Sequence, residues 1–181
     1  HRGPDSQKYF VNSERKIFFG FNRLSIVDLS NMADQPMLDK ESERIIVFNG
    51  EIYNYSKLKN FLKTKDYIFR TSSDTEVILK AYDFWKDSLI EHLEGMFSIV
   101  IYDPKENKIF FARDRAGEKP LYYYHNEQAF CFASEIKALI WHPLFDRRVS
   151  HSNLAEYLTL GYTSKSKTIL RGFKKLAPGT I

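Results

Sequence analysis

Residues 96–133, MFSIVIYDPKENKIFFARDRAGEKPLYYYHNEQAFCFA, carry the strongest indication of how this chain folds. Four short apolar runs lie within them, at 96–102, 108–112, 120–124 and 129–133, and short turns separate the runs. Short runs rich in aromatic and β-branched residues predict strands, and the brief turns between them predict an antiparallel meander. The runs are almost entirely apolar, so we expect this sheet to be buried.

Helical patterns lie on both sides of the predicted sheet. Apolar residues at helical spacing predict a helix over 55–63. Residues 73–76, Ser-Asp-Thr-Glu, have the form of a capping box and precede a second run of helical spacing. Shorter patterns predict helices over 89–93, 135–141 and 152–160, the last ending at a glycine.

Two further strand-like runs precede the sheet, at 17–21 and 45–48. The second run ends at Asn49-Gly50, which is a strong turn signal. The whole pattern predicts an α+β protein, in which helices cover several antiparallel strands.

Composition excludes several classes of protein. Of the 181 residues, 43% are hydrophobic and 28% are charged, which excludes a disordered chain, and the apolar runs are too short to cross a membrane. The net charge of +4 comes from the region beyond residue 156, where no acidic residue occurs. A nucleic-acid-binding protein more typically carries a basic stripe with stacking aromatics, so we predict no nucleic-acid partner and no membrane.

Metal, nucleotide and disulfide motifs are absent from the sequence. None of the five histidines has another at i+4, and the single cysteine completes neither a disulfide framework nor a thiolate metal site. There is no phosphate-binding loop and no Gly-x-Gly-x-x-Gly motif. Cys131 lies between phenylalanines, a setting more typical of a buried thiol than of a nucleophile. We therefore predict no metal and no cofactor in this chain.

Two polar clusters, Arg23 and Asn49-Gly50-Glu51, look out of place beside apolar residues, and Asp74 is a third polar position of interest. Arg23 lies within an apolar segment, where a charge must be paired or functional. Asn49-Gly50 follows a buried run, and periodicity alone favours a hairpin turn there over a functional site. Asp74 lies at the start of a predicted helix, where a favourable interaction with the helix dipole would be a sufficient role. Taken singly, none of these positions defines a site.

Taken together, these positions belong to an ordered series of eight motifs. The motifs are HRGPD at 1–5, RLSIVD at 23–28, QPM at 35–37, NGEIYN at 49–54, SDTE at 73–76, EGMF at 94–97, RDRAGEKPL at 113–121 and ASEIKAL at 133–139. In this order they resemble the glutaminase domain of glutamine-hydrolysing asparagine synthetases, which are class II glutamine amidotransferases. The resemblance covers nearly all of the chain.

The resemblance implies a fold and a domain organisation. The family fold is a four-layer αββα sandwich of two antiparallel sheets covered by helices, of the N-terminal nucleophile hydrolase type. We expect the amidotransferase domain to span 1–160, and 161–181 to be a basic connecting segment toward a synthetase domain outside the sequence. In the family, the first strand and the nucleophilic cysteine precede the motif at 1–5. We therefore expect both to be missing here, and the 181 residues alone to be inactive.

The resemblance also implies a reaction. In the family, the cysteine thiolate attacks the side-chain amide of glutamine, its own α-amine acts as the base, and a thioester forms and is hydrolysed. The ammonia passes to the synthetase domain, which uses ATP and Mg to convert aspartate to asparagine. The implied partners are glutamine, the synthetase domain of the same protein and a second copy in a homodimer, in the cytoplasm.

Site residues follow from the matching motifs. Arg23 resembles the arginine that binds the α-carboxylate of glutamine, and the residues after it continue the binding segment: Leu24, Ser25, Ile26 and Val27. The Asn49 side chain and the Gly50 N–H resemble the oxyanion hole. Glu51 and Asp74 resemble the acids near the α-amine of glutamine.

Two alternatives remain open from the sequence. One is another class II amidotransferase or a related synthetase, which would make phosphoribosyl amine, glucosamine phosphate, glutamate, a β-lactam or a modified cell-surface sugar. The other is a domain that keeps the fold without catalysis and serves assembly or regulation.

Overall fold

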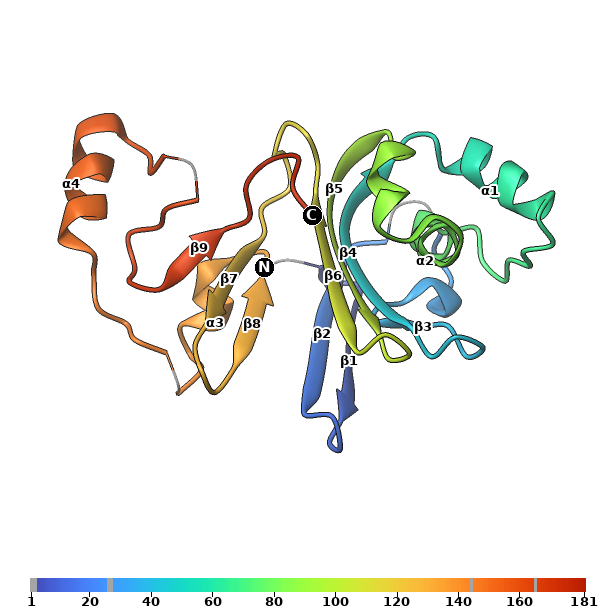
Figure 1. Cartoon of the computed structure of the whole chain (residues 1–181), viewed down its shortest axis with the longest axis horizontal. Coiled ribbons are helices and arrows are strands. Elements are labelled where there is room, and N and C mark those ends of the chain that lie inside the picture. The colour runs from blue at the N-terminus through green and yellow to red at the C-terminus, as the bar shows by residue number, and fades with distance from the viewer. Residues whose placement is uncertain (1–2, 26–27, 144, 165) are drawn as a thin grey trace. The chain divides into compact units, whose positions relative to one another are not determined.

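A computed structural model describes residues 3–25, 28–143, 145–164 and 166–181. The chain divides into two compact units (Figure 1). The N-terminal unit comprises residues 1–112 with Ile181, and the C-terminal unit comprises residues 113–180.

A four-stranded sheet forms the centre of the N-terminal unit. Its strands follow the order β3 (Met37–Leu38), β4 (Ile45–Ile52), β5 (Gly95–Asp103) and β6 (Lys108–Arg113). β4 pairs antiparallel with β3 and with β5, in a register that sets Asn49 opposite Ser98 and Gly50 opposite Phe97. Asn49-Gly50 therefore lies inside a strand, and the hairpin-turn interpretation of this pair is wrong.

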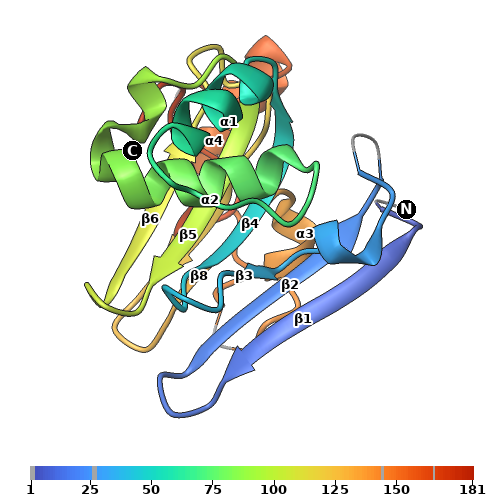
Figure 2. The ribbon, with the colours of Figure 1, turned by 90° about the vertical axis from the view of Figure 1, so that its right-hand side faces the viewer.

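Two helices cover one face of this sheet, α1 (Tyr55–Lys63) and α2 (Asp74–Trp85), as Figures 1 and 2 show. The helices predicted over 55–63 and after residues 73–76 are thus confirmed. A 3₁₀ turn, η2 (Lys86–Glu91), follows α2 near the short helix predicted over 89–93. The core between helices and sheet is apolar and includes Ile46, Phe48 and Ile52 of β4, Phe97, Ile99 and Ile101 of β5, Leu58 and Leu62 of α1, and Val77, Ile78 and Tyr82 of α2.

A two-stranded hairpin precedes the sheet, formed by β1 (Ser6–Asn12) and β2 (Ile17–Arg23). The strand predicted over 17–21 is confirmed, whereas β1 was not predicted because its residues are mostly polar. Arg15 in the hairpin turn donates from Nη1 to the hydroxyl of Tyr102 at 2.8 Å, which ties the turn to the end of β5. A short 3₁₀ turn, η1 (Asn31–Ala33), lies between β2 and β3.

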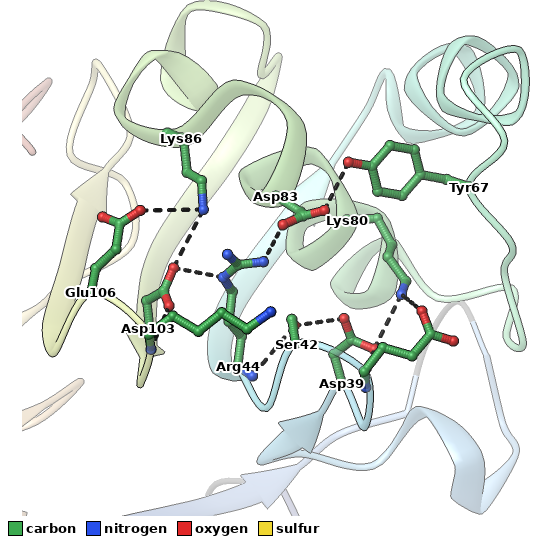
Figure 3. Close-up of polar contacts among 11 residues, drawn as sticks. Asp39, Ser42, Arg44, Tyr67, Lys80, Asp83, Lys86, Asp103 and Glu106 are labelled. Atoms are coloured by element: carbon green, nitrogen blue, oxygen red, sulfur yellow. Dashed lines mark hydrogen bonds and ion pairs between the residues drawn. The ribbon is translucent and has the colours of Figure 1, made fainter.

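A cluster of charged side chains joins α2 to the sheet (Figure 3). Arg44, which is 4% exposed, donates from Nε to Asp103 at 2.6 Å and pairs with Asp83 of α2. Lys86 pairs with Asp103 at 3.5 Å and with Glu106 at 3.4 Å. Burial by itself would raise the pKa of Asp103, but the bond and the charge of Arg44 outweigh it and hold that pKa below its ordinary value. The cluster therefore stabilises this unit while its carboxylates are ionised.

The C-terminal unit is built on a three-stranded antiparallel sheet. β7 (Tyr122–His125) lies between β8 (Phe130–Ala133) and β9 (Phe173–Lys175). The helices of this unit are α3 (Ile136–Leu139) and α4 (His151–Leu160), which confirm the helices predicted over 135–141 and 152–160. The helix α4 ends at Gly161, whose left-handed φ of 77° is the conformation that favours glycine.

The prediction of one continuous meander over residues 96–133 is wrong. Its first two strands, β5 and β6, lie in the four-stranded sheet, and the last two, β7 and β8, lie in the three-stranded sheet. The segment between them folds around Arg113, whose guanidinium donates to the carbonyls of Gly117, Lys119 and Leu176 at 2.5, 2.7 and 2.5 Å. The segment between β6 and β7 is thus held by side-chain bonds from Arg113 and does not continue as a strand.

The described strands form three sheets, of two, four and three strands. The four-layer sandwich concerns how sheets stack on one another, and it stays a prediction. Residues 161–181 contain β9, which pairs with β7 inside the C-terminal unit; the domain boundary after residue 160 stays a prediction too. Among the described residues, no helix has both the length and the apolar composition needed to cross a bilayer.

Candidate functional site

The second half of β4 approaches β5 more closely than side chains would allow. Gly50 has a φ of 154°, and a Cβ at this position would lie 2.0 Å from the carbonyl oxygen of Met96. Gly95 on β5 has a φ of 152°, and its Cβ would lie 2.2 Å from the carbonyl oxygen of Glu51. Both positions therefore require glycine, because a side chain would collide with the backbone of the neighbouring strand. Neither glycine lies in a turn.

One edge of β4 presents a row of backbone N–H groups. The Phe48 N–H donates to Oε1 of Gln35 at 2.6 Å, and the Ile52 N–H donates to Oδ2 of Asp74 at 3.2 Å. Alternate residues of a strand direct their N–H groups to the same edge. Gly50 lies midway between Phe48 and Ile52, so its N–H points to this edge as well.

The side chains of Asn49 and Glu51 lie on the other face of the sheet from α1 and α2. Phe48 and Ile52 are part of the core under the helices, and successive side chains of a strand alternate between its faces. Asn49 and Glu51 are both half-buried. Two predicted site residues, with Gly50 between them, thus form one short segment of strand.

The first turn of α2 lies against this segment. Ser73 caps the helix by accepting the Thr75 N–H at 3.1 Å, as the capping-box pattern predicts. The second half of the box has a different partner, because the Glu76 carboxylate accepts the N–H groups of Arg70 and Thr71 at 2.7 to 3.1 Å. Glu76 therefore orders the loop before α2.

Asp74 is a buried acid at the start of α2, with 6% of its surface exposed. Burial raises the pKa of its carboxyl, and the nearby charge of Glu51 raises it further; the bonds from backbone N–H groups act in the opposite direction but are weaker. Two acids that repel each other in this way would be stabilised by a cation placed near both of them.

Arg23 ends β2 and is 7% exposed. Its Nη1 donates to Asp34 at 2.8 Å and to the carbonyl of Ser30 at 2.9 Å, and its Nη2 donates to the carbonyl of Asp28. Asp34 also pairs with Lys8 at 2.7 Å. The sequence predicts that a charge at position 23 is paired or functional, and the bond to Asp34 shows that Arg23 is paired. The contact of Arg23 with glutamine stays a prediction.

Asp28 connects the segment after β2 to α2. Its carboxylate accepts the N–H of Ser30 at 2.8 Å and the N–H of Ser72 at 2.8 Å. The bonds from Ser30 are the largest of the effects that hold the pKa of Asp28 below its ordinary value. Arg23, through the Asp28 carbonyl, is thereby linked to the loop that leads into α2 and to Asp74.

The binding segment after Arg23 is described only in part. Leu24 is 60% exposed, and the Ser25 N–H donates to the carboxylate of Asp5 at 2.7 Å. The predicted site residues Ile26 and Val27 lie outside the described residues.

The bonds above connect Arg23 to the loop before α2, and Asp74 to Ile52 at the end of the strand segment that contains Asn49, Gly50 and Glu51. Three residues that hold them received no role from the sequence: Asp28, Asp34 and Gln35. Asp28 and Gln35 fall inside the motifs at 23–28 and 35–37, so the available signal was a polar side chain within a motif of the family.

Cys131 lies elsewhere, on β8 in the C-terminal unit. It is half-buried, and burial raises the pKa of its thiol, which disfavours the reactive thiolate. In the part of the chain that the structure describes, no three His, Cys, Asp or Glu side chains gather in a way that would hold a metal ion.

Comparison with known sequences identifies the family. The model of the glutamine amidotransferase domain matches residues 1–181. Asparagine synthetases 3 and 1 (glutamine-hydrolyzing) of Bacillus subtilis are 38% and 39% identical over 180 residues, which cover 98% and 99% of this chain but 29% and 28% of those proteins. The chain belongs to the glutamine amidotransferase domain family and is homologous over nearly its whole length to part of these synthetases. It spans less than a third of the length of these curated relatives.

A solved structure supports the same fold. The glutamine phosphoribosylpyrophosphate amidotransferase of Bacillus subtilis matches 90% of this chain and 35% of its own, with a TM-score of 0.59 and 22% identity. The mixed α/β fold is thus similar to that of part of this amidotransferase.

Proposed function

We propose that this domain binds glutamine, hydrolyses its side-chain amide and supplies the ammonia to a synthetase domain that converts aspartate to asparagine. The observation that carries the proposal is the β4 edge. There the Gly50 N–H lies between two backbone N–H groups that already have side-chain acceptors, Gln35 and Asp74. The homology to asparagine synthetases supports the choice of product.

The charges around this edge suit a zwitterionic amino acid. Asp74 and Glu51 would receive the α-ammonium group, since a cation between them relieves their mutual repulsion. Arg23 would receive the α-carboxylate. Its bonds within the described part of the chain use three of the five guanidinium N–H groups, and two N–H groups suffice for a bidentate contact.

The reacting amide would lie over β4. A cysteine thiolate attacks the amide carbon, ammonia leaves with a proton from the cysteine's own α-amine, and water hydrolyses the thioester to glutamate. The Gly50 N–H and the Asn49 side-chain amide would donate to the oxygen that becomes negatively charged at each tetrahedral stage. The raised pKa of the Cys131 thiol argues against Cys131 as the nucleophile, and the family resemblance is what points to an N-terminal cysteine.

The finer fold belongs to the same proposal. We infer that the sheets stack as a four-layer αββα sandwich, with α1 and α2 as one outer layer. Their cover of one face of the four-stranded sheet supports this arrangement.

Product analysis tests the function. The complete protein is supplied with glutamine, ATP and Mg, together with aspartate, phosphoribosyl pyrophosphate or a sugar phosphate in separate reactions. We expect glutamate and asparagine in equal amounts with aspartate, and asparagine also when ammonia replaces glutamine. Amination of a different acceptor would refute the asparagine assignment, and a lack of glutamate with every acceptor would refute the amidotransferase assignment.

A further inference from the structure

Gln35 occupies the point where β3 leaves β4. The β3–β4 register pairs Met37 with Ile46, and its continuation would set residue 35 opposite Phe48. In place of a backbone pair, the Gln35 side-chain amide takes that position. Its Oε1 accepts the Phe48 N–H at 2.6 Å, and its Nε2 donates to the Phe48 carbonyl at 3.1 Å. One side chain therefore supplies both hydrogen bonds that a neighbouring strand would have made.

The same amide also bonds to α2. Nε2 of Gln35 lies 3.2 Å from the hydroxyl oxygen of Thr75, the residue after Asp74. Gln35 is 6% exposed and Thr75 is 2% exposed, so these bonds form away from water. A buried amide with three bonds of this kind has one orientation, because any rotation leaves a polar group unsatisfied.

The β4 edge is consequently held at two points. Gln35 fixes Phe48, and Asp74 fixes Ile52. Both fixing residues are tied to the first turn of α2, and Gly50 lies at the midpoint of the segment between them. A donor that must meet a transition-state oxygen needs its position set to a fraction of an ångström.

We propose that Gln35 is a positioning residue for the oxyanion donors, setting Asn49 and Gly50 through its bonds to Phe48 and Thr75. This role rests on the proposed glutaminase function. Gln35 itself touches neither glutamine nor the reacting atoms. It keeps the strand segment in the geometry that catalysis requires.

Kinetics of the complete protein test this role. Gln35→Met keeps the side-chain length and removes all three bonds. We expect the glutaminase kcat to fall by about 10- to 100-fold, in line with a displacement of up to about 1 Å, while the KM for glutamine changes much less. Ammonia-dependent synthesis should be unaffected. A matched control is Tyr67→Phe, which removes one bond to Asp83 on α2 within the charged cluster of Figure 3 and should leave kcat unchanged.

A double variant separates positioning from general destabilisation. If Gln35 acts through Asn49, the combined loss in Gln35→Met with Asn49→Ala should be clearly smaller than the product of the two single losses. Thr75→Val removes only the bond between Gln35 and α2, and it serves as the test if Gln35→Met fails to fold. We expect Thr75→Val to lower kcat by about 3- to 10-fold at unchanged KM, as one uncharged hydrogen bond would.

The outcomes distinguish the two proposals. A folded Gln35→Met protein with normal kcat, or losses that multiply fully, would overturn the positioning role while the glutaminase assignment stands. If Gln35→Met does not fold, a normal kcat in Thr75→Val would overturn the positioning role in the same way. An Asn49→Ala protein with normal glutaminase activity would overturn the proposed function, and the positioning role with it.

Discussion

Replacement of Arg23 by alanine tests how this domain recognises glutamine. Arg23 is 7% exposed, and truncation of one partner of a buried, hydrogen-bonded charge pair costs about 2–5 kcal/mol. At about 1.4 kcal/mol for each factor of ten, kcat/KM for glutamine should fall by about 30-fold to several thousand-fold. The loss should appear mainly in KM, because the α-carboxylate carries the same charge in the substrate and in the transition state.

The structure also predicts a stability cost that must be separated from this loss. Asp34 keeps its pair with Lys8 at 2.7 Å, so it retains a counter-charge, but the carbonyls of Ser30 and Asp28 lose a donor. Because Asp28 is half-buried and Ser30 is exposed, water can replace the lost donor, and a cost of about 0.5–1.5 kcal/mol for each bond is expected. Arg23→Lys is the informative companion. It keeps the charge without the planar fork, so its KM should fall between those of the parent and the alanine variant.

The assay compares two nitrogen sources in the same preparation. Glutamine-dependent and ammonia-dependent synthesis are measured for each variant beside a melting curve. We expect the ammonia-dependent rate per folded molecule to be preserved. An equal fall of both rates would mean that Arg23 only supports the fold, and the assignment to the α-carboxylate would be refuted.

The remaining predictions address other parts of the structure. Burial and the charge of Glu51 raise the pKa of Asp74, so the KM for glutamine should rise as the pH falls from neutral, at a higher pH than an ordinary carboxyl would cause. Asp74→Asn should raise KM and flatten this pH dependence. A pH profile that is unchanged in the variant would exclude Asp74 as the cause. Arg44→Met should destabilise the protein by about 3–5 kcal/mol in chemical denaturation, because it removes the 2.6 Å bond from the buried Asp103 and leaves only the longer pair with Lys86. A loss below about 1 kcal/mol would contradict the stabilising role of the cluster. Asp103 has a lowered pKa, so the stability that it provides is complete above the ordinary carboxyl pKa of about 4 and is lost as the pH falls below that value. Below a pH of about 4, the free energy of unfolding should therefore fall more steeply with pH in the parent protein than in Arg44→Met. Gly50→Ala should prevent the close approach of β4 and β5 and so lower the melting temperature and the activity, since its Cβ would lie 2.0 Å from the Met96 oxygen. A soluble variant with the parental melting temperature and activity would show that the strands can separate without cost.

Local signals predicted the local structure well. The helix over 55–63 and the cap at Ser73 depend on residues close in sequence, and both are confirmed. The sheets depend on distant residues. β7 pairs with β9, with Tyr122 opposite Lys175, and no pattern within residues 96–133 contains that information.

The site shows the same limit at single residues. Asn49-Gly50 carries a strong turn signal, yet the glycine serves a close contact with Met96 on a strand that lies far away in sequence. The motif residues located the site, whereas the amide of Gln35 that completes a sheet edge could only be found once β3 and β4 were placed in register.

The kinetics of glutamine hydrolysis by Asn49→Ala in the complete protein test the central claim most directly. If the Asn49 amide stabilises the oxyanion, kcat should fall by about 10²- to 10³-fold with a much smaller change in KM, and ammonia-dependent synthesis should continue at the parental rate. If Asn49 only supports the strand, the variant should melt at a lower temperature and retain the parental kcat per folded molecule. That second result would contradict the assignment of the β4 edge as the oxyanion site.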